Sequence, residues 1–167
     1  MSLTLILGGA RSGKSRHAEE LVERHPLPWS YIATAQAYDD EMVERIALHR
    51  SRRSTGWETI DAPHDIVPAL ASLPKDSPVL LDCLTLWLSN RMLADADLEA
   101  ESEALRAALK AHSGPVFVVS NEVGLGIVPD NALARRFRDA QGRLNQAIAA
   151  QADAVIFMVA GIPMKVK

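Results

Sequence analysis

One segment near the start of the chain has the spacing of a phosphate-binding loop. Residues 8–15 read Gly-Gly-Ala-Arg-Ser-Gly-Lys-Ser, which satisfies the pattern G-x-x-x-x-G-K-[ST]. Glycines at positions 8 and 13 let the backbone curl, so that its N–H groups point inward where a larger side chain would block a phosphate. We expect Lys14 to reach the β- and γ-phosphates of a nucleoside triphosphate and Ser15 to bind Mg²⁺. The alternative is a glycine-rich turn with an incidental lysine, which the apolar run before the loop and the helical pattern after it disfavour.

An acidic residue at the end of a later apolar run could complete this site. Asp82 directly follows Val79-Leu80-Leu81, a run typical of a buried strand. A carboxylate at that position could hold a magnesium-bound water. Asp82 could also cap a helix that begins near Leu84. The two roles are compatible, so both stay open.

A second cluster combines one histidine with several arginines. If residues 39–54 form a helix, His49 lies on one face with Arg45, Arg52 and Arg53. Positive charges on one face repel each other unless an anion is bound, so the cluster could contact a second phosphate. A neutral imidazole could attack phosphorus there, while guanidinium groups stabilise charge on the phosphate oxygens. The spacing alone fits a solvent-exposed basic face with a surface histidine more often than it fits a nucleophile.

Polar residues follow two further apolar runs. Thr34 comes after residues 30–33, and Asn121 and Glu122 come after residues 116–119. The carboxyl ends of strands in doubly wound folds line the ligand crevice, which makes these side chains candidate contacts. An ordinary polar turn over residues 120–126 is an equally good interpretation.

Short apolar runs alternate with helical patterns along the whole chain. We expect strands at residues 3–7, 30–33, 57–60, 79–81, 116–119 and 155–159. We expect helices at residues 15–24, 39–54, 64–73, 84–92, 97–112 and 130–151. Asp130 should cap the last helix, Leu133 should lie on its apolar face, and a final segment, 164–166, should follow a turn at 161–163. Uninterrupted apolar strands between helices predict an α/β fold with a mostly parallel sheet covered on both faces.

Composition restricts the class of protein further. A length of 167 residues predicts one domain, residues 1–167, and 48% apolar with 23% charged residues is typical of a globular chain. A net charge of −3 and 5% aromatic residues disfavour a nucleic-acid partner. The single cysteine, Cys83, excludes an intramolecular disulfide and a cysteine-based zinc site, and we expect it to be an inert small apolar residue. No membrane span or signal peptide is evident, so we expect a cytoplasmic protein.

Several motifs occur in an order that resembles one family. They are Gly8 to Arg16, Tyr31-Ile32-Ala33-Thr34-Ala35, Asp40-Glu41-Met42, Arg45-Ile46-x-x-His49, Asn121 to Pro129, and Gly142-Arg143-x-Asn145-Gln146. From about Leu5 to Lys167 the chain closely resembles the bifunctional adenosylcobinamide kinase / adenosylcobinamide-phosphate guanylyltransferases of cobalamin biosynthesis. The phosphate loop is shared with many families, whereas the asparagine–glutamate loop and the histidine segment are far more particular.

The resemblance implies two reactions. Family members phosphorylate adenosylcobinamide with ATP or GTP, and then transfer GMP from GTP to adenosylcobinamide phosphate through a guanylylated histidine. That histidine corresponds to His49, and since position 48 is leucine rather than the second histidine of some relatives, it is the single candidate. The resemblance also implies a RecA-like P-loop NTPase fold, Mg²⁺ and a homotrimer. Two other functions stay open: a small-molecule kinase without a covalent intermediate, and a nucleotide-dependent switch.

The resemblance also assigns site residues. His49 and Lys14 are the expected catalytic residues, and Ser15 and Asp82 are the expected Mg²⁺ ligands. The expected nucleotide contacts are Gly8, Gly9, Ala10, Arg11, Ser12, Gly13, Lys14, Ser15, Ala33, Thr34, Ala35, Arg50, Ser51, Arg52, Arg53, Asp61 and Asp82.

Overall fold

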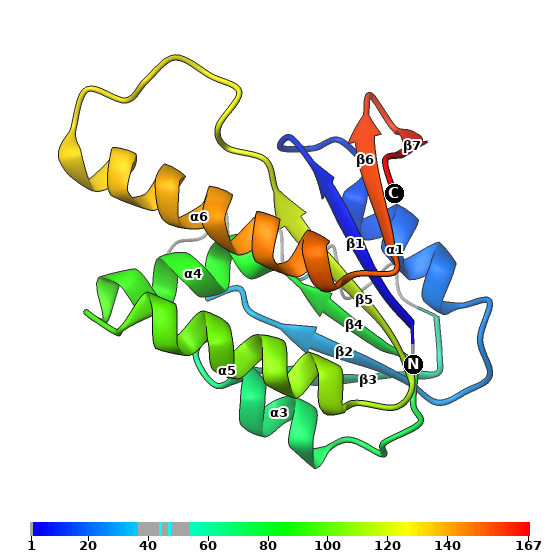
Figure 1. Ribbon diagram of the computed structural model, residues 1–167. Helices are drawn as coiled ribbons and strands as arrows, with labels where there is room; N and C mark the ends of the chain where they lie inside the picture. Colours follow the sequence, from blue (N-terminus) through cyan, green and yellow to red (C-terminus); the bar gives the residue numbers. More distant parts are fainter. Residues whose placement is uncertain (1, 37–43, 45–46, 48–53) are drawn as a thin grey trace.

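A computed structural model describes residues 2–36, 44, 47 and 54–167 of the chain. The expected helix over residues 39–54, with His49 and its arginines, lies almost wholly outside these residues. The described strands form one seven-stranded sheet in the order β3-β2-β4-β5-β1-β6-β7 (Figure 1). Their bounds are β1 Ser2–Gly8, β2 Trp29–Ala33, β3 Trp57–Asp61, β4 Val79–Asp82, β5 Pro115–Asn121, β6 Ala154–Val159 and β7 Ile162–Lys165. Every neighbouring pair is parallel except β6 and β7, which confirms the predicted α/β fold with a mostly parallel sheet.

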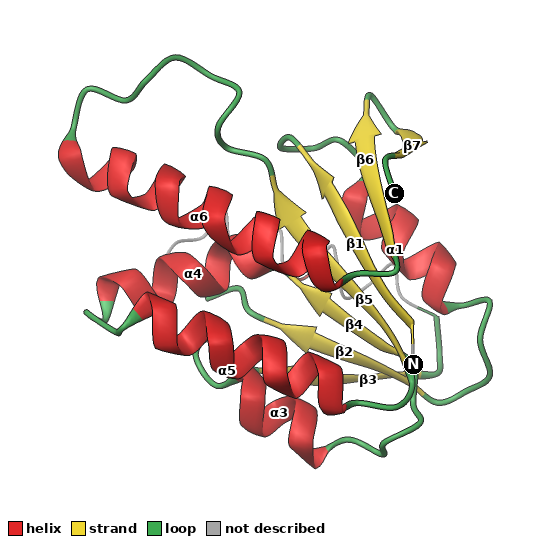
Figure 2. Ribbon diagram, viewed as in Figure 1, coloured by secondary structure: helices red, strands yellow, loops and turns green. Residues whose placement is uncertain are grey.

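Helices cover both faces of the sheet, as the uninterrupted apolar strands predict (Figure 2). They are α1 Lys14–Val22, α3 Ile66–Ser72, α4 Leu84–Leu93, α5 Leu98–Ala111 and α6 Ala132–Gln151. Neighbouring strand residues contribute to two different cores, because successive side chains point to opposite faces. Leu5 of β1 packs in the core beneath α3 to α6, whereas Ile6 packs with Ala18 and Val22 of α1.

The start of α6 differs from the prediction. Asn131, not Asp130, caps this helix: its Oδ1 accepts a hydrogen bond from the Ala134 N–H at 2.7 Å. Leu133 is 55% exposed rather than buried, because the first turn of α6 extends beyond the edge of the sheet and has no strand beneath it (Figure 1). The core-facing part of the helix therefore begins later than the apolar pattern suggests.

The end of the chain also differs from the expected short segment at 164–166. The turn falls at Ala160 and Gly161, both of which have positive φ angles, 50° and 82°. β7 therefore begins at Ile162 and pairs antiparallel with β6. The turn comes earlier than predicted because Pro163 lies within the edge strand β7 rather than in the turn. Proline has no N–H to donate, and an edge strand tolerates that loss.

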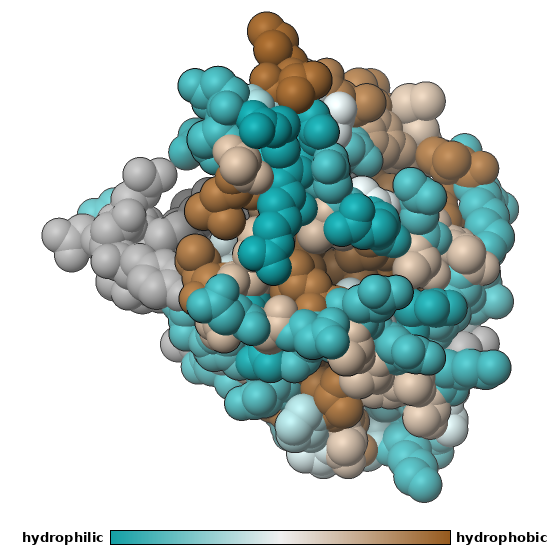
Figure 3. All heavy atoms as spheres, turned by 60° about the vertical axis from the view of Figure 1, so that its left-hand side comes forward, coloured by the Kyte–Doolittle hydropathy of each residue, from teal (hydrophilic) through white to brown (hydrophobic). Residues whose placement is uncertain are grey.

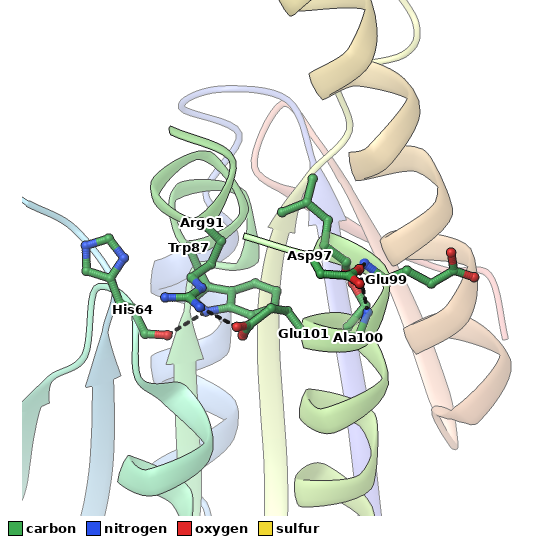
Figure 4. A network of polar contacts seen from close by, with 9 residues as sticks. His64, Trp87, Arg91, Asp97, Glu99, Ala100 and Glu101 are labelled. Atoms are coloured by element: carbon green, nitrogen blue, oxygen red, sulfur yellow. Dashed lines mark hydrogen bonds and ion pairs between the residues drawn. The ribbon is translucent and has the colours of Figure 1, made fainter. Parts of the chain in front are cut away.

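Contacts on one side of the sheet fix α4, whose first turn follows Asp82. The Trp87 indole donates a hydrogen bond to the His64 carbonyl at 3.0 Å, and Arg91 forms an ion pair with Glu101 of α5 (Figure 4). The Asp97 carboxylate accepts from two N–H groups of the first turn of α5, which caps that helix. In the described part of the chain, no helix is both long and apolar enough to span a membrane.

Candidate nucleotide-binding site

The phosphate loop lies between β1 and α1, and its backbone requires glycine at two positions. Gly8 has a φ of +154°, and a Cβ placed on it would lie 2.7 Å from the Met158 carbonyl oxygen and from Ser12 Oγ. Gly13 has a φ of +92°, a left-handed conformation that L side chains rarely adopt. Both glycines of the motif are therefore needed for the shape of the loop and for its close approach to β6.

Lys14 lies inside the curve of this loop. Its side chain is buried, and its ammonium group donates a hydrogen bond to the Gly9 carbonyl at 2.5 Å and to Ser12 Oγ at 3.5 Å. Lys14 is also the first residue of α1, where unpaired N–H groups and the helix dipole favour an anion. The loop thus places a positive charge and several N–H donors around one position suited to a phosphate group.

The segments that follow β5 and β6, the two strands on either side of β1, hold the loop in place. The Gly161 N–H donates to the Ser12 carbonyl at 3.1 Å, and the Glu122 N–H donates to the Gly8 carbonyl at 3.1 Å. In Figure 1 the loop lies between the long connection that follows β5 and the β6–β7 hairpin. The sequence pattern at Gly161 predicts only a turn and contains no signal for this support.

The ends of β2, β3 and β4 bring the predicted acidic residues to one edge of the sheet. Ala33 is paired with Asp61 on one side and with Asp82 on the other. Asp82 is half-buried, and its Oδ2 accepts a hydrogen bond from the Tyr31 hydroxyl at 2.8 Å, while Asp61 is exposed. The N-cap of α4 is Cys83, with no side-chain bond, so the interpretation of Asp82 as a helix cap is wrong.

Tyr31 is a residue of this edge for which the sequence predicts no role. It faces Asp82 because Tyr31 is paired with Leu80, and side chains two positions apart on a strand share a face. That relation depends on which strands are neighbours and on their register. The chain itself gives no local signal for it.

Thr34 holds this edge together. Its side chain is fully buried, its Oγ1 donates to the Cys83 carbonyl at 2.7 Å, and the same oxygen accepts from the Cys83 N–H at 2.8 Å. Burial and, to a lesser extent, the charge of Asp82 raise the pKa of the Cys83 thiol to about 11, against the opposing effects of nearby backbone N–H groups and the charge of Lys14. The thiol is therefore neutral and inert at ordinary pH, as predicted. The charges of both Asp82 and Lys14 act on it.

The oxygen donors at this edge suit a hard divalent cation. The Ser15 hydroxyl lies in the first turn of α1, and the Asp82 carboxylate ends β4. Magnesium prefers such ligands and usually keeps water and substrate phosphate oxygens as the others. Within residues 2–36 and 54–167, no three His, Cys, Asp or Glu side chains come together as a metal site. A cation here would therefore depend on the nucleotide's own phosphates.

Most of the predicted nucleotide contacts lie within the described residues and share one edge of the sheet. Residues 8–15, 33–35, 61 and 82 lie along the edge formed by the carboxyl ends of the parallel strands. His49, Arg50, Ser51, Arg52 and Arg53 lie outside the described residues.

The fold and the site together define a P-loop NTPase with a RecA-like sheet. The chain superimposes on the crystal structure of the RadB recombinase with a TM-score of 0.51 and 15% identity, over 93% of this chain and 73% of that chain. Residues 4–166 match the family described as cobinamide kinase / cobinamide phosphate guanyltransferase. The chain belongs to this family of transferases.

Two relatives show how closely the chain follows the family. It is 51% identical over 166 residues to a bifunctional adenosylcobalamin biosynthesis protein of Pseudomonas aeruginosa, covering 98% of this chain and 96% of the relative. It is 41% identical over 181 residues to a bifunctional adenosylcobalamin biosynthesis protein of Salmonella typhimurium, covering 99% of each chain. The resemblance identified from the motifs is thus confirmed over nearly the full length.

Proposed function

We propose that this protein phosphorylates adenosylcobinamide with ATP or GTP and then transfers GMP from GTP to the resulting adenosylcobinamide phosphate. The products of the second step are adenosyl-GDP-cobinamide and pyrophosphate. One observation carries the proposal: a complete phosphate loop, with Lys14 inside it, lies within the segment that matches the family. We assign both reactions to one domain spanning residues 1–167.

In the kinase step, the substrate hydroxyl oxygen attacks the γ-phosphorus of the triphosphate. The bond from that phosphorus to the bridging oxygen breaks, the nucleoside diphosphate leaves, and the hydroxyl proton passes to solvent. Lys14 and the N–H groups of residues 8–15 offset the negative charge on the phosphate oxygens, which lowers the barrier without covalent participation.

Ser15 and Asp82 would hold Mg²⁺ through oxygen ligands, with Tyr31 donating a hydrogen bond to the second oxygen of Asp82. When bound, this ion neutralises part of the charge on the β- and γ-phosphates. Ala33, Thr34, Ala35 and Asp61 complete the edge at which we place the nucleotide. Because both hydroxyl bonds of Thr34 go to Cys83, we assign it the task of fixing this edge.

In the guanylyl transfer, an imidazole nitrogen of His49 attacks the α-phosphorus of GTP, and the bond to pyrophosphate breaks. A phosphate oxygen of adenosylcobinamide phosphate then attacks the same phosphorus, and the phosphorus–nitrogen bond breaks to restore the histidine. Arg50, Ser51, Arg52 and Arg53 would bind the phosphate oxygens. This assignment is supported by the residue pattern and the family resemblance.

The covalent intermediate gives the sharpest test. Wild-type protein incubated with GTP and Mg²⁺, without corrinoid, should gain the mass of one GMP and release pyrophosphate. The His49→Ala variant should gain none, and His25→Ala, which removes a histidine at the opposite end of β2, should label like wild type. A labelled His49→Ala protein would overturn the assignment of the nucleophile. Wild-type protein that turns over cobinamide yet never labels would instead indicate a simple kinase.

We also propose that the protein is a cytoplasmic homotrimer. The connection after β5, which lies at the top of the molecule in Figures 1 and 3, exposes several large apolar side chains: Leu125 is 81%, Ile127 96% and Val128 64% exposed. Apolar side chains of this size are more stable when covered by a partner surface. Light scattering coupled to size-exclusion chromatography should give three times the chain mass, and a monomer at micromolar concentration would contradict the proposal.

A further inference from the structure

A cluster of buried polar side chains lies between α6 and the end of β5, in a place where apolar residues would pack as well. Ser120 and Gln141 are fully buried, and Asn145 is 5% exposed. Gln141 and Asn145 are one helical turn apart, so both point from α6 toward the sheet. We refer to these three residues as the α6 polar cluster.

Hydrogen bonds within the cluster fix the orientation of the Asn145 amide. Its Oδ1 accepts from Ser120 Oγ at 2.7 Å and from Gln141 Nε2 at 2.9 Å. The Gln141 amide also donates to Ser120 Oγ at 2.9 Å. Because two donors face Oδ1, the Nδ2 group of Asn145 must point the other way, and it donates to the Asn121 carbonyl at 3.0 Å.

Asn121 is held from both sides. Its N–H donates to Thr85 Oγ1 of α4 at 2.8 Å, while its carbonyl accepts from Asn145 of α6. Asn121 is the last residue of β5 and is paired in register with Gly8, where the phosphate loop begins. The next N–H, that of Glu122, donates to the Gly8 carbonyl at 3.1 Å. Two helices thus fix the backbone that in turn fixes the first residue of the loop.

Stability alone does not explain this arrangement. Burying three polar side chains costs desolvation energy, which hydrogen bonds only partly return. Gln141 Oε1 is buried and has no hydrogen-bond partner within the described part of the chain, so one acceptor remains unsatisfied. An apolar cluster of similar volume would avoid that cost but could not bind the Asn121 carbonyl.

We propose that Asn145 is a positioning residue for the triphosphate. Through the Asn121 peptide it holds Gly8 in the geometry that directs the N–H groups of the phosphate loop at the β- and γ-phosphates. The role rests on the proposed function, because it concerns the same nucleotide site. Asn145 also belongs to the Gly142-Arg143-x-Asn145-Gln146 motif, and no step of the two proposed reactions uses a residue of that motif.

A pair of variants separates positioning from ordinary packing. Asn145→Leu keeps the side-chain volume but removes the bond to Asn121. Ser120→Ala disturbs the same buried cluster, but the Gln141 amide still donates to Asn145 Oδ1 and so keeps the Asn145 amide directed at Asn121. Both should lower the melting temperature. Asn145→Leu alone should raise the Kd for ATP, measured by calorimetry, and the KM for ATP by about tenfold, with kcat at saturating ATP within about threefold of wild type. Hydrogen exchange at the Glu122 amide should quicken in Asn145→Leu and not in Ser120→Ala.

Equal ATP affinity and equal Glu122 exchange in the two variants would overturn the proposal. If Asn145→Leu fails to fold, Thr85→Val removes the opposite bond to Asn121 with little change of shape and should raise the Kd for ATP in the same direction. An unchanged Kd in that variant would be equally decisive against the proposal. Wild-type protein that binds ATP but never turns over cobinamide would contradict the proposed reactions. The role of Asn145 would still be tested by Glu122 hydrogen exchange and by the Kd for ATP in the variants.

Discussion

The phosphate loop and the end of β5 are neighbours in space, yet the sequence encodes them in opposite ways. Residues 8–15 contain the glycines, the lysine and the serine that shape and charge the loop. Asn121 instead depends on Thr85, 36 positions before it, and on Asn145, 24 positions after it. The first region is determined locally, and the second is determined by tertiary contacts.

This difference follows from two kinds of role: residues of the loop face the substrate, whereas the residues around Asn121 hold the loop in position. Loop residues must be adjacent because one continuous backbone has to wrap a phosphate. Supporting residues need only reach a backbone atom, so they can come from any element that packs nearby. We therefore expect loss of a loop group that faces the phosphates to lower the reaction rate by orders of magnitude, and substitutions around Asn121 to lower it by a smaller factor.

Lys14→Met should have the largest effect. It removes the positive charge inside the loop but keeps most of the buried stem, so the fold should remain. We expect kcat/KM for the kinase reaction to fall by about 10²–10³-fold, the usual cost of losing one preorganised electrostatic group. Arg16→Met is a suitable control, because this side chain is exposed and pairs with Glu20 outside the loop.

The Lys14 variant also tests the comparison itself. Hydrogen exchange at the Glu122 amide should equal that of wild type, since the Lys14 ammonium group bonds to Gly9 and Ser12, whereas the Glu122 N–H bonds to the Gly8 carbonyl. Faster exchange at Glu122 would show that the two regions are not independently encoded.

The sequence predicted what depends on adjacent residues. The loop, the position of Asp82 at a strand end, and the strands β1 to β6 with the helices described between them could all be recognised from local pattern. The pairing of Ala33 with Asp82 was not predicted, because it depends on β2 and β4 being neighbours in the sheet.

The sequence could not predict what depends on register and packing. Leu133 follows the apolar spacing of α6 but lies beyond the sheet, and Gln141 interrupts that spacing yet is fully buried. Whether a helical position is buried depends on what lies beneath it, which a periodic pattern does not record. For the same reason the sequence did not indicate Tyr31, whose hydroxyl donates to Asp82 only because β2 and β4 are neighbours.

Gly8→Ala should have an intermediate effect and should disturb both regions. The added Cβ would lie 2.7 Å from the Met158 carbonyl oxygen. Relieving this contact should lower the free energy of unfolding by about 1–3 kcal/mol, the range typical of overpacking. Because the Gly8 carbonyl accepts from Glu122, exchange at that amide should also quicken.

Gly9→Ala provides the matched control for Gly8→Ala. A Cβ at position 9 meets nothing within 4 Å, so chemical denaturation should give an unfolding free energy close to that of wild type. If the two alanine variants were equally stable, the close approach to β6 would not be what requires glycine at position 8.

Tyr31→Phe should have the smallest effect, and it asks whether Asp82 needs support from a distant residue at all. The variant removes one hydroxyl, which donates to Asp82 Oδ2 at 2.8 Å, and leaves the ring against Trp57, 5.9 Å between centroids. One lost hydrogen bond is worth about 0.5–1.5 kcal/mol, so the Mg²⁺ concentration that half-saturates ATP binding should rise about threefold to tenfold. Ser77→Ala is the control, since it removes one buried hydroxyl that donates to the Pro74 carbonyl, before β4 and away from Asp82. An unchanged Mg²⁺ requirement would mean that the Asp82 carboxylate is oriented by its own strand. Support from residues distant in sequence would then matter at the end of β5, where Asn121 lies, but not at the end of β4.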